Sequence, residues 1–167
     1  AALCVLGLTA AHAKLTTAEI ERLGKDLTPV GAERAGNKEG TIPKWEGGLT
    51  KAPAGFDAKK GWADPYAADK PLYTITAANA EQHKDKLAPG QLALLKRYPS
   101  YKMEVYPTRR SAAFPESAYE IIKNEAGKIE SANEGNSVLN QVASTTPFPI
   151  PKTGAEAIWN HAFRYRG

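Results

Sequence analysis

A long stretch rich in glycine and proline, residues 25–71, most constrains how this chain can fold. Seven glycines alternate there with four prolines before Pro71, and apolar residues do not recur at the spacing of a helix or a strand. Glycine and proline interrupt regular structure, and a free loop of this length is uncommon in a compact domain. We therefore expect an extended arm that packs on a surface. The aromatic residues expected to pin it are Trp45, Phe56, Trp62 and Tyr66.

Short regular elements are expected on both sides of the arm. A capping box at Thr16 and Glu19 predicts a helix that ends at Gly24. Alternating apolar and charged residues over 101–105 predict a half-buried strand. Further helices are predicted over residues 77–86 with a cap at Thr76, after Pro89, after Pro115, and after a second capping box at Thr153 and Glu156. Further strands are predicted over residues 72–75 and 128–131, and a flexible loop over 133–146. These elements predict an α+β fold.

The first 13 residues have the features of a secretion signal. An uncharged apolar run ends in Ala11-His12-Ala13, where small residues fit the signal peptidase. The run is shorter than the ~20 apolar residues that a membrane-spanning helix needs. We expect a partial signal peptide over residues 1–13, cleavage after Ala13, export to the periplasm and no transmembrane segment. The alternative is a buried N-terminal strand.

The 154 residues after Ala13 supply few side chains for a core. Leu, Ile, Val and Phe account for 26 of them, a low share for a globular domain. The one cysteine, Cys4, lies in the predicted signal, so the remaining chain has no thiol chemistry. We expect residues 14–167 to be the N-terminal part of one larger periplasmic domain, completed by chain beyond Gly167.

The net charge of +4 raises the question of an anionic partner. Basic side chains are interspersed with acidic ones, and export removes the chain from most cellular nucleic acid. Nucleic acid is therefore not expected as a partner, and anionic lipid or lipopolysaccharide fits the charge better. The alternative is that the charge only keeps the protein soluble.

Sequence patterns that indicate catalysis, a metal or a cofactor do not occur. His83 and His161 are far apart, and neither has the spacing of a zinc ligand. The chain contains no Gly-x-Ser-x-Gly or Ser-x-x-Lys motif and no phosphate-binding glycine loop. We expect a non-catalytic protein that needs neither metal nor cofactor.

Aromatic residues beside proline and paired arginines are the candidate ligand-binding positions. In Phe148-Pro149-Ile150-Pro151, rigid backbone presents Phe148 and Ile150, which either line an apolar groove for acyl chains or form a stiff corner against a sheet. Guanidinium groups bind phosphate and carboxylate through paired hydrogen bonds. The candidate arginines, which could equally be structural salt-bridge partners, are Arg109, Arg110, Arg164 and Arg166.

The last predicted helix carries the broadest apolar stripe of the chain, which must be covered by other protein or by a ligand. The stripe consists of Ala155, Ile158, Trp159, Ala162 and Phe163.

Three long stretches of the sequence carry a family resemblance. They are GKDLTPVGAERAGNKEGTIPKWEGGLTKAPAG from Gly24, DPYAADKPLYTITAANAEQHKDKLAPGQLALLKRYPSYKMEVYPTRRSAAFP from Asp64, and PFPIPKTGAEAIWNHAFRYRG from Pro147. They resemble the N-terminal part of the longer bacterial proteins known as domain of unknown function 1329, and residues 124–146 match only loosely.

The resemblance implies a fold and a type of activity. This family is grouped with the lipoprotein carriers and receptors of the LolA/LolB-like superfamily, in which helices cover an antiparallel half-barrel that holds acyl chains. It implies that this chain supplies helices, an extended arm and a few short strands of such a protein. It also implies that Trp159 and Phe163 face the ligand cavity, with Arg164 or Arg166 at its rim; ordinary core packing is the alternative. No catalytic residues follow from it.

We therefore expect a periplasmic, non-catalytic carrier or sorting protein for lipid, lipoprotein or another hydrophobic ligand at the outer membrane. The alternative is an interaction module that tethers an outer-membrane barrel or a transporter and has no ligand cavity. An exported hydrolase is the third interpretation.

Overall fold

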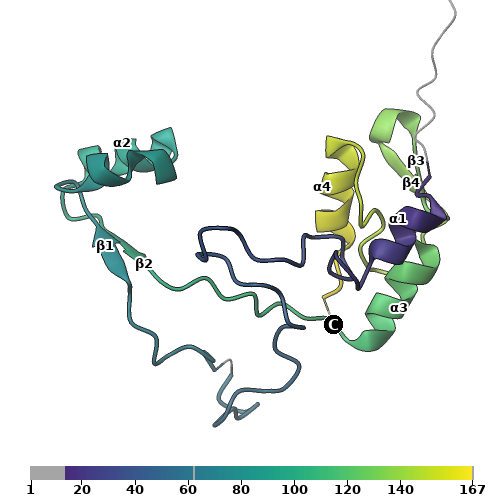
Figure 1. Ribbon diagram of the computed structural model, residues 1–167, viewed down its shortest axis with the longest axis horizontal. Helices are drawn as coiled ribbons and strands as arrows, with labels where there is room; N and C mark the ends of the chain where they lie inside the picture. The colour runs from purple at the N-terminus through teal and green to yellow at the C-terminus, as the bar shows by residue number, and fades with distance from the viewer. Residues whose placement is uncertain (1–13, 62, 167) are drawn as a thin grey trace, which may run out of the picture. The chain divides into compact units, whose positions relative to one another are not determined.

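Two compact units make up the computed structural model, which describes residues 14–61 and 63–166 (Figure 1). Unit 1 consists of residues 14–37, 44–50 and 110–166, and unit 2 consists of residues 38–43, 51–61 and 63–109. Each contains short helices and one two-stranded antiparallel sheet, which confirms the predicted α+β class. The predicted signal peptide, residues 1–13, lies outside the described residues.

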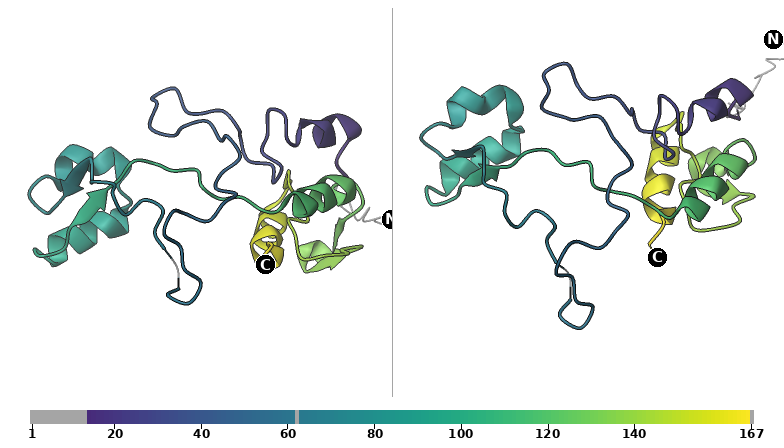
Figure 2. Two further views of the ribbon diagram at one scale, coloured as in Figure 1. Left: turned by 90° about the horizontal axis from the view of Figure 1, so that it is seen from below. Right: turned by 60° about the horizontal axis from the view of Figure 1, so that its bottom comes forward.

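Unit 2 is a two-stranded sheet with two helices beside it (Figures 1 and 2). Strand β1 (Tyr73–Ile75) pairs with β2 (Met103–Val105), so that Ile75 lies opposite Met103. The 3-10 helix η1 (Ala80–Lys86) and the α-helix α2 (Pro89–Arg97) follow β1 in the chain. Pro89 occupies the first turn of α2, as predicted, because its missing N–H group is not needed there.

A small apolar core holds the elements of unit 2 together. Leu95 is completely buried, and Ile75 and Ala80 are buried beside it. The half-buried side chains packed around this core are Leu87, Leu92, Met103 and Val105. The half-buried strand predicted over residues 101–105 is therefore confirmed for Met103–Val105, whereas Tyr101 is exposed and lies before the strand.

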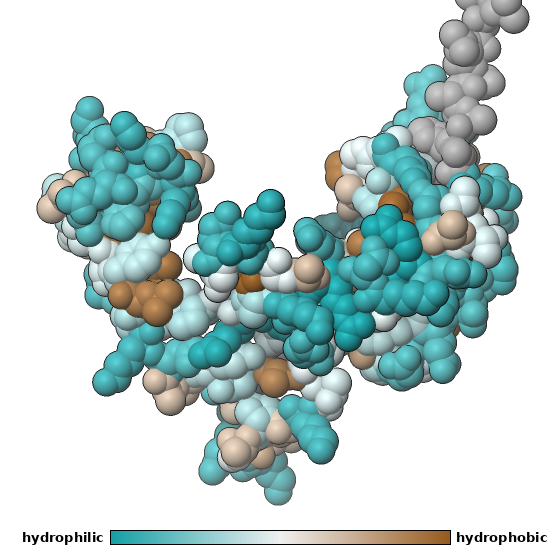
Figure 3. All heavy atoms as spheres, in the orientation of Figure 1, coloured by the Kyte–Doolittle hydropathy of each residue, from teal (hydrophilic) through white to brown (hydrophobic). Residues whose placement is uncertain are grey.

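Large apolar side chains also remain on the surface of unit 2. Leu72 is 65% exposed and Leu94 is 43% exposed. Figure 3 shows such apolar residues as brown spheres on this unit. Single exposed apolar residues are normal in soluble proteins, so they carry no functional argument here.

The helix predicted over residues 77–86 begins later than expected. The N–H group of Thr76 donates to the side-chain oxygen of Asn79 (2.7 Å), and the Asn79 amide donates to the carbonyl of Thr74 (2.9 Å). This side-chain turn replaces the first turn of a helix. As a result η1 starts at Ala80, and the prediction that Thr76 caps it is wrong.

The first helices of unit 1 begin where the sequence predicts. The hydroxyl of Thr16 accepts the N–H of Glu19, and the Glu19 carboxylate accepts the N–H of Thr16, which completes the capping box of α1 (Thr17–Arg22). Helix α3 (Glu116–Glu125) follows Pro115. Among the described residues, no helix has the length and apolar character needed to cross a membrane.

The last helix, α4 (Gly154–Phe163), departs from its prediction in two respects. The Thr153 hydroxyl accepts the N–H of Glu156, but the buried Glu156 carboxylate accepts the N–H of Lys152, so the second capping box is only half formed. The predicted apolar stripe is wrong at Ile158, which is 70% exposed, and at Ala162, which is also exposed. The neighbouring face, which includes Glu156, packs instead.

The flexible loop predicted over residues 133–146 is in part a hairpin. Strands β3 (Glu130–Ala132) and β4 (Ser137–Leu139) pair antiparallel around the 3-10 turn η2 (Asn133–Gly135). All three residues of η2 have positive φ, which reverses the chain. The prediction failed because a left-handed backbone is uncommon for glutamate, which occupies the middle position.

Part of the arm belongs to unit 1 and is held through its backbone. The guanidinium of Arg110 donates hydrogen bonds of 2.6–3.2 Å to three consecutive carbonyl groups, those of Glu33, Arg34 and Ala35. The indole N–H of Trp45 donates to the carbonyl of Ala112 (3.2 Å), as expected of a residue that pins the arm.

The other aromatic residues of the arm differ from one another. Phe56 is exposed, so the expectation that it pins the arm is wrong. Tyr66 is half-buried under the guanidinium of Arg109, 5.1 Å from the ring centre. Trp62 lies outside the described residues.

A tight loop of the arm approaches Pro149 closely. The N–H of Thr28 donates to the carbonyl of Ala32 (2.7 Å), and the Thr28 hydroxyl accepts the N–H of Ala32 (3.0 Å). Between them Gly31 has a φ of +87°, and a Cβ atom placed there would lie 1.5 Å from the carbonyl oxygen of Pro149. Only glycine permits this approach.

Candidate ligand-binding site

The predicted site residues Arg109 and Arg110 make structural contacts. Arg109, in unit 2, donates hydrogen bonds of 3.0 and 2.8 Å to the carboxylate of Asp69. Arg110, in unit 1, holds the three arm carbonyls described above. Neither arginine lines the two pockets described below. The contacts of Arg109 correspond to the salt-bridge alternative.

Phe148 and Ile150 lie at a rigid corner of unit 1. The side chain of Asn160 on α4 binds both polar backbone groups of Phe148, accepting its N–H (2.8 Å) and donating to its carbonyl (2.7 Å). Phe148 is buried, and it lines with Ile150 a cavity of about 20 Å³. A cavity of this size admits about one water molecule. These contacts correspond to the stiff-corner alternative, and the role of both residues in ligand binding stays a prediction.

Trp159 and Phe163 form a stacked pair on α4. Their ring centres are 5.4 Å apart, and the indole N–H of Trp159 donates to the carbonyl of Gly135 (2.7 Å). This bond fixes α4 to the hairpin turn η2. These contacts correspond to the core-packing alternative. A role of Trp159 and Phe163 in a ligand cavity stays a prediction.

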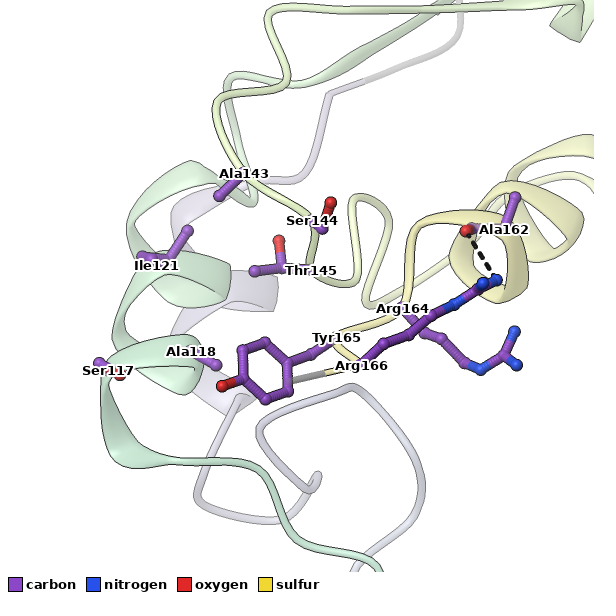
Figure 4. A pocket seen from close by; sticks show the side chains of 10 residues that line it. All are labelled: Ser117, Ala118, Ile121, Ala143, Ser144, Thr145, Ala162, Arg164, Tyr165 and Arg166. Atoms are coloured by element: carbon purple, nitrogen blue, oxygen red, sulfur yellow. Dashed lines mark hydrogen bonds between the residues drawn. The ribbon is translucent and has the colours of Figure 1, made fainter.

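The last two predicted site residues, Arg164 and Arg166, line a pocket of about 460 Å³ in unit 1, which we call the arginine pocket (Figure 4). Its other lining residues are Ser117, Ala118, Ile121, Ala143, Ser144, Thr145, Ala162 and Tyr165. Figure 4 shows the Tyr165 ring beside the first turns of α3, and Arg166 extending back to the last turn of α4. The pocket thus combines two guanidinium groups with several hydroxyl groups, and no acidic residue lines it.

A second pocket of about 790 Å³, the aromatic pocket, lies between the arm and the start of α3, also within unit 1. Its large apolar lining residues are Trp45, Leu49, Phe114 and Tyr119. Trp45 and Tyr119 meet edge to face with ring centres 6.5 Å apart. The polar lining includes Arg34 and Glu116.

A row of aromatic rings connects the walls of the two pockets. Phe114 lies 5.9 Å from Tyr119 in the aromatic pocket and 5.6 Å from Tyr165 in the arginine pocket, measured between ring centres. The N–H of Phe114 donates to the hydroxyl of Tyr119 (2.7 Å), which fixes the row to α3. This wall of rings can pack against an apolar group in the aromatic pocket while a charged group lies in the arginine pocket.

Comparison with known proteins gives a family. Residues 74–167 match the model of the family described as "Protein of unknown function (DUF1329)". The chain belongs to this family. It is also 48% identical over 160 residues to the uncharacterized protein PA3922 of Pseudomonas aeruginosa strain PAO1, an alignment that covers 95% of the chain and 35% of that relative. The DUF1329 chain therefore spans about a third of the length of this relative. No solved structure matches the chain described here.

Sequence reasoning missed most of the aromatic row of this DUF1329 chain. Tyr119 lies on α3, and Phe114 lies directly before Pro115 at the start of this helix. The helix predicted after Pro115 therefore accounts for the local structure of both residues but not for their contact. The sequence signals only one member of the row, Phe114, which lies directly before Pro115; Tyr119 and Tyr165 do not precede proline.

In unit 1 of the DUF1329 chain, an ion pair and two hydrogen bonds shift the pKa of Glu19. The Lys152 ammonium group and the N–H and hydroxyl of Thr16 hold the pKa of Glu19 down at about 2, because all three donate hydrogen bonds to its ionised form. The contact joins α1 to the segment that enters α4. Its contribution to stability is therefore present above the ordinary pKa of 4.5 and is lost as the pH falls toward 2.

The variant Glu19→Gln is expected to remove this part of the pH dependence. At neutral pH the variant should unfold at lower urea concentration than the wild type, and the two midpoints should converge as the pH approaches 2. The matched control is Glu21→Gln on the same helix, because Glu21 makes only a 3.8 Å contact with Lys25. Urea midpoints that differ by the same amount at all pH values would contradict the assignment.

Proposed function

We propose that this chain is the N-terminal part of an exported, non-catalytic protein that carries or sorts lipid, lipoprotein or another hydrophobic ligand in the periplasm at the outer membrane. The proposal includes a LolA/LolB-like antiparallel half-barrel in the whole protein, of which this chain supplies helices, the arm and short strands. Export is proposed from the apolar run and the Ala11-His12-Ala13 site in the first 13 residues.

The aromatic pocket is the observation that carries this proposal. Ligand sites for small molecules are typically clefts of ~300–1,000 Å³ lined mainly by apolar and aromatic side chains with a few polar groups. The aromatic pocket, at about 790 Å³, falls in this range and has such a lining. An apolar ligand gains ~25 cal/mol for each Å² of apolar surface that it removes from water, so the half-buried aromatic walls of this pocket favour its binding.

Native mass spectrometry of the purified full chain tests whether a hydrophobic ligand is bound. We expect lipid to co-purify with the wild-type protein and to be lost from Leu49→Trp, because the larger side chain occupies the pocket. Leu49 is 46% exposed, and its structural bond to Ser111 is made by the backbone, so the substitution leaves the fold intact.

Leu139→Trp provides the matched control, since Leu139 is 47% exposed in β4 and does not line the aromatic pocket. Equal lipid in Leu49→Trp and Leu139→Trp would remove the aromatic pocket from the proposal. Wild-type protein without any lipid would contradict the carrier function and favour the interaction module that tethers an outer-membrane barrel or a transporter.

A further inference from the structure

We propose that the arginine pocket binds an anionic oxygen group, either a phosphate or a carboxylate. The inference rests on residues of this pocket alone and holds whether or not the aromatic pocket carries an apolar ligand. Free phosphate and the head group of an anionic phospholipid present the same chemistry to it.

The positive charge in this pocket is not compensated by protein. Arg22 pairs with Asp26 (2.8 Å) and Arg109 pairs with Asp69 (2.8 Å), as arginines in folded proteins commonly do. Arg164 and Arg166 form no such ion pair with any carboxylate of the described chain, and no acidic side chain lines the pocket. An anion entering the pocket therefore meets two guanidinium groups and no competing carboxylate.

The present contacts of both guanidinium groups leave donors for a ligand. Arg164 donates from Nη1 to the carbonyl of His161 (2.7 Å), and the same nitrogen lies 3.2 Å from Nε2 of the His161 ring. Arg166 donates from Nη2 to the carbonyl of Ala162 at 3.5 Å, the outer limit of a hydrogen bond. A guanidinium has five N–H groups, so most of them are unused here. Because both side chains are exposed, they can turn toward a bound anion without repacking.

Thr145 is the independent observation that points to a ligand. The residue is only 3% exposed, and it lines the pocket, yet its hydroxyl makes no hydrogen bond within the described structure. Among the described residues, the side-chain atoms that are both fully buried and without a partner are the Ser131 hydroxyl and the Gln141 side-chain oxygen. The Thr145 hydroxyl therefore still reaches the pocket, where it can donate to a ligand oxygen. Figure 4 shows Thr145 in the middle of the lining, next to Ser144.

The start of α3 adds a favourable field. Ser117 and Ala118 lie in its first turn and line the pocket. The N-terminal end of a helix carries a partial positive charge, which favours an anion, although the N–H of Ala118 is already bonded to the carbonyl of Pro115 (2.9 Å). With the Ser117 hydroxyl, the pocket offers donors from α3, from the segment before α4 and from the segment after it.

Three variants of the full chain test the site. Arg164→Gln with Arg166→Gln removes both positive charges, and the matched control, Lys44→Gln with Lys123→Gln, removes two positive charges from unit 1 outside the pocket. Thr145→Val removes only the hydroxyl at nearly constant shape. Since that hydroxyl has no partner, the valine variant should be at least as stable as wild type, which separates a binding role from a structural one.

The probes are inorganic phosphate, followed by amide chemical shifts in NMR, and dihexanoyl-phosphatidylglycerol below its micelle concentration. We expect at least one probe to shift the amides of Ser117, Ser144 and Thr145. Binding should weaken at least about tenfold in the double arginine variant and roughly three- to tenfold in Thr145→Val, as expected for charge-assisted and neutral hydrogen bonds. The double lysine variant should bind as wild type does.

The two probes separate the sources of the anion. Binding of phosphate as tight as that of the lipid assigns the site to a free anion, and binding of the lipid alone assigns it to a head group. Wild-type protein that co-purifies without lipid but still binds phosphate would sink the carrier function and leave this site standing. No shift with either probe, or unchanged affinity in Thr145→Val and in the double arginine variant, would overturn the proposal.

Discussion

Replacing Gly31 with alanine is expected to lower the free energy of unfolding of unit 1 by more than about 4 kcal/mol, which is an exceptionally large effect for one substitution. An alanine at a φ of +87° costs ~1–2 kcal/mol in backbone strain alone. The larger part of the effect comes from the Cβ atom, which would lie 1.5 Å from the carbonyl oxygen of Pro149. Either the arm or the Phe148 corner must then leave its place.

Gly24→Ala is the matched control for this effect. Gly24 has a similar φ of +82°, but nothing lies within 4 Å of its added Cβ atom. The control should therefore be destabilised only by the backbone strain, which amounts to ~1–2 kcal/mol. Urea unfolding followed by tryptophan fluorescence measures the stability of both variants, since Trp45 and Trp159 lie in unit 1. Equal losses in the two variants would show that the arm does not dock against Pro149.

Replacing Leu95 with alanine is expected to cost about 2–5 kcal/mol of the stability of unit 2, the usual range for a buried leucine. Leu95 is 0% exposed and lies at the centre of a core that contains only two other buried apolar residues among those described, Ile75 and Ala80. A core this small cannot rearrange to fill the cavity left behind. The neighbouring Leu94 is 43% exposed, so Leu94→Ala should change stability by less than about 0.5 kcal/mol.

Amide hydrogen exchange of β1 and β2 measures the effect of both substitutions. The bond from the N–H of Leu72 to the carbonyl of Val105 (2.7 Å) and the ladder beside it should lose protection in Leu95→Ala and keep it in Leu94→Ala. Similar protection in the two variants would mean that the sheet is not stabilised by this core.

Local signals in the sequence predicted the elements well. The capping box at Thr16, proline at the start of α2 and the alternation in β2 each depend on residues within one or two turns, so a single sequence contains the whole signal. The hairpin turn η2 was missed because its backbone is stabilised by pairing of β3 with β4 rather than by the preference of its own residues.

Contacts between distant segments were beyond sequence reasoning. The bonds between Asn160 and Phe148, and the approach of Gly31 to Pro149, leave no periodicity or motif in either segment. For the same reason the candidate site was only partly predicted. Arginine pairs were recognised as phosphate or carboxylate ligands, but only the tertiary structure distinguishes Arg109, already bound to Asp69, from Arg164, which has no acidic partner among the described residues.

The three hydrogen bonds that Arg110 donates to carbonyl groups decide which substitutions this contact tolerates. A guanidinium that binds the backbone does not depend on which side chains Glu33, Arg34 and Ala35 carry. Substitutions at those positions can therefore accumulate without releasing this contact, while a single substitution at Arg110 removes all three bonds at once. Mutational tolerance at this contact is thus one-sided: the side chains at positions 33–35 can change without loss of the three bonds, whereas the side chain at position 110 cannot.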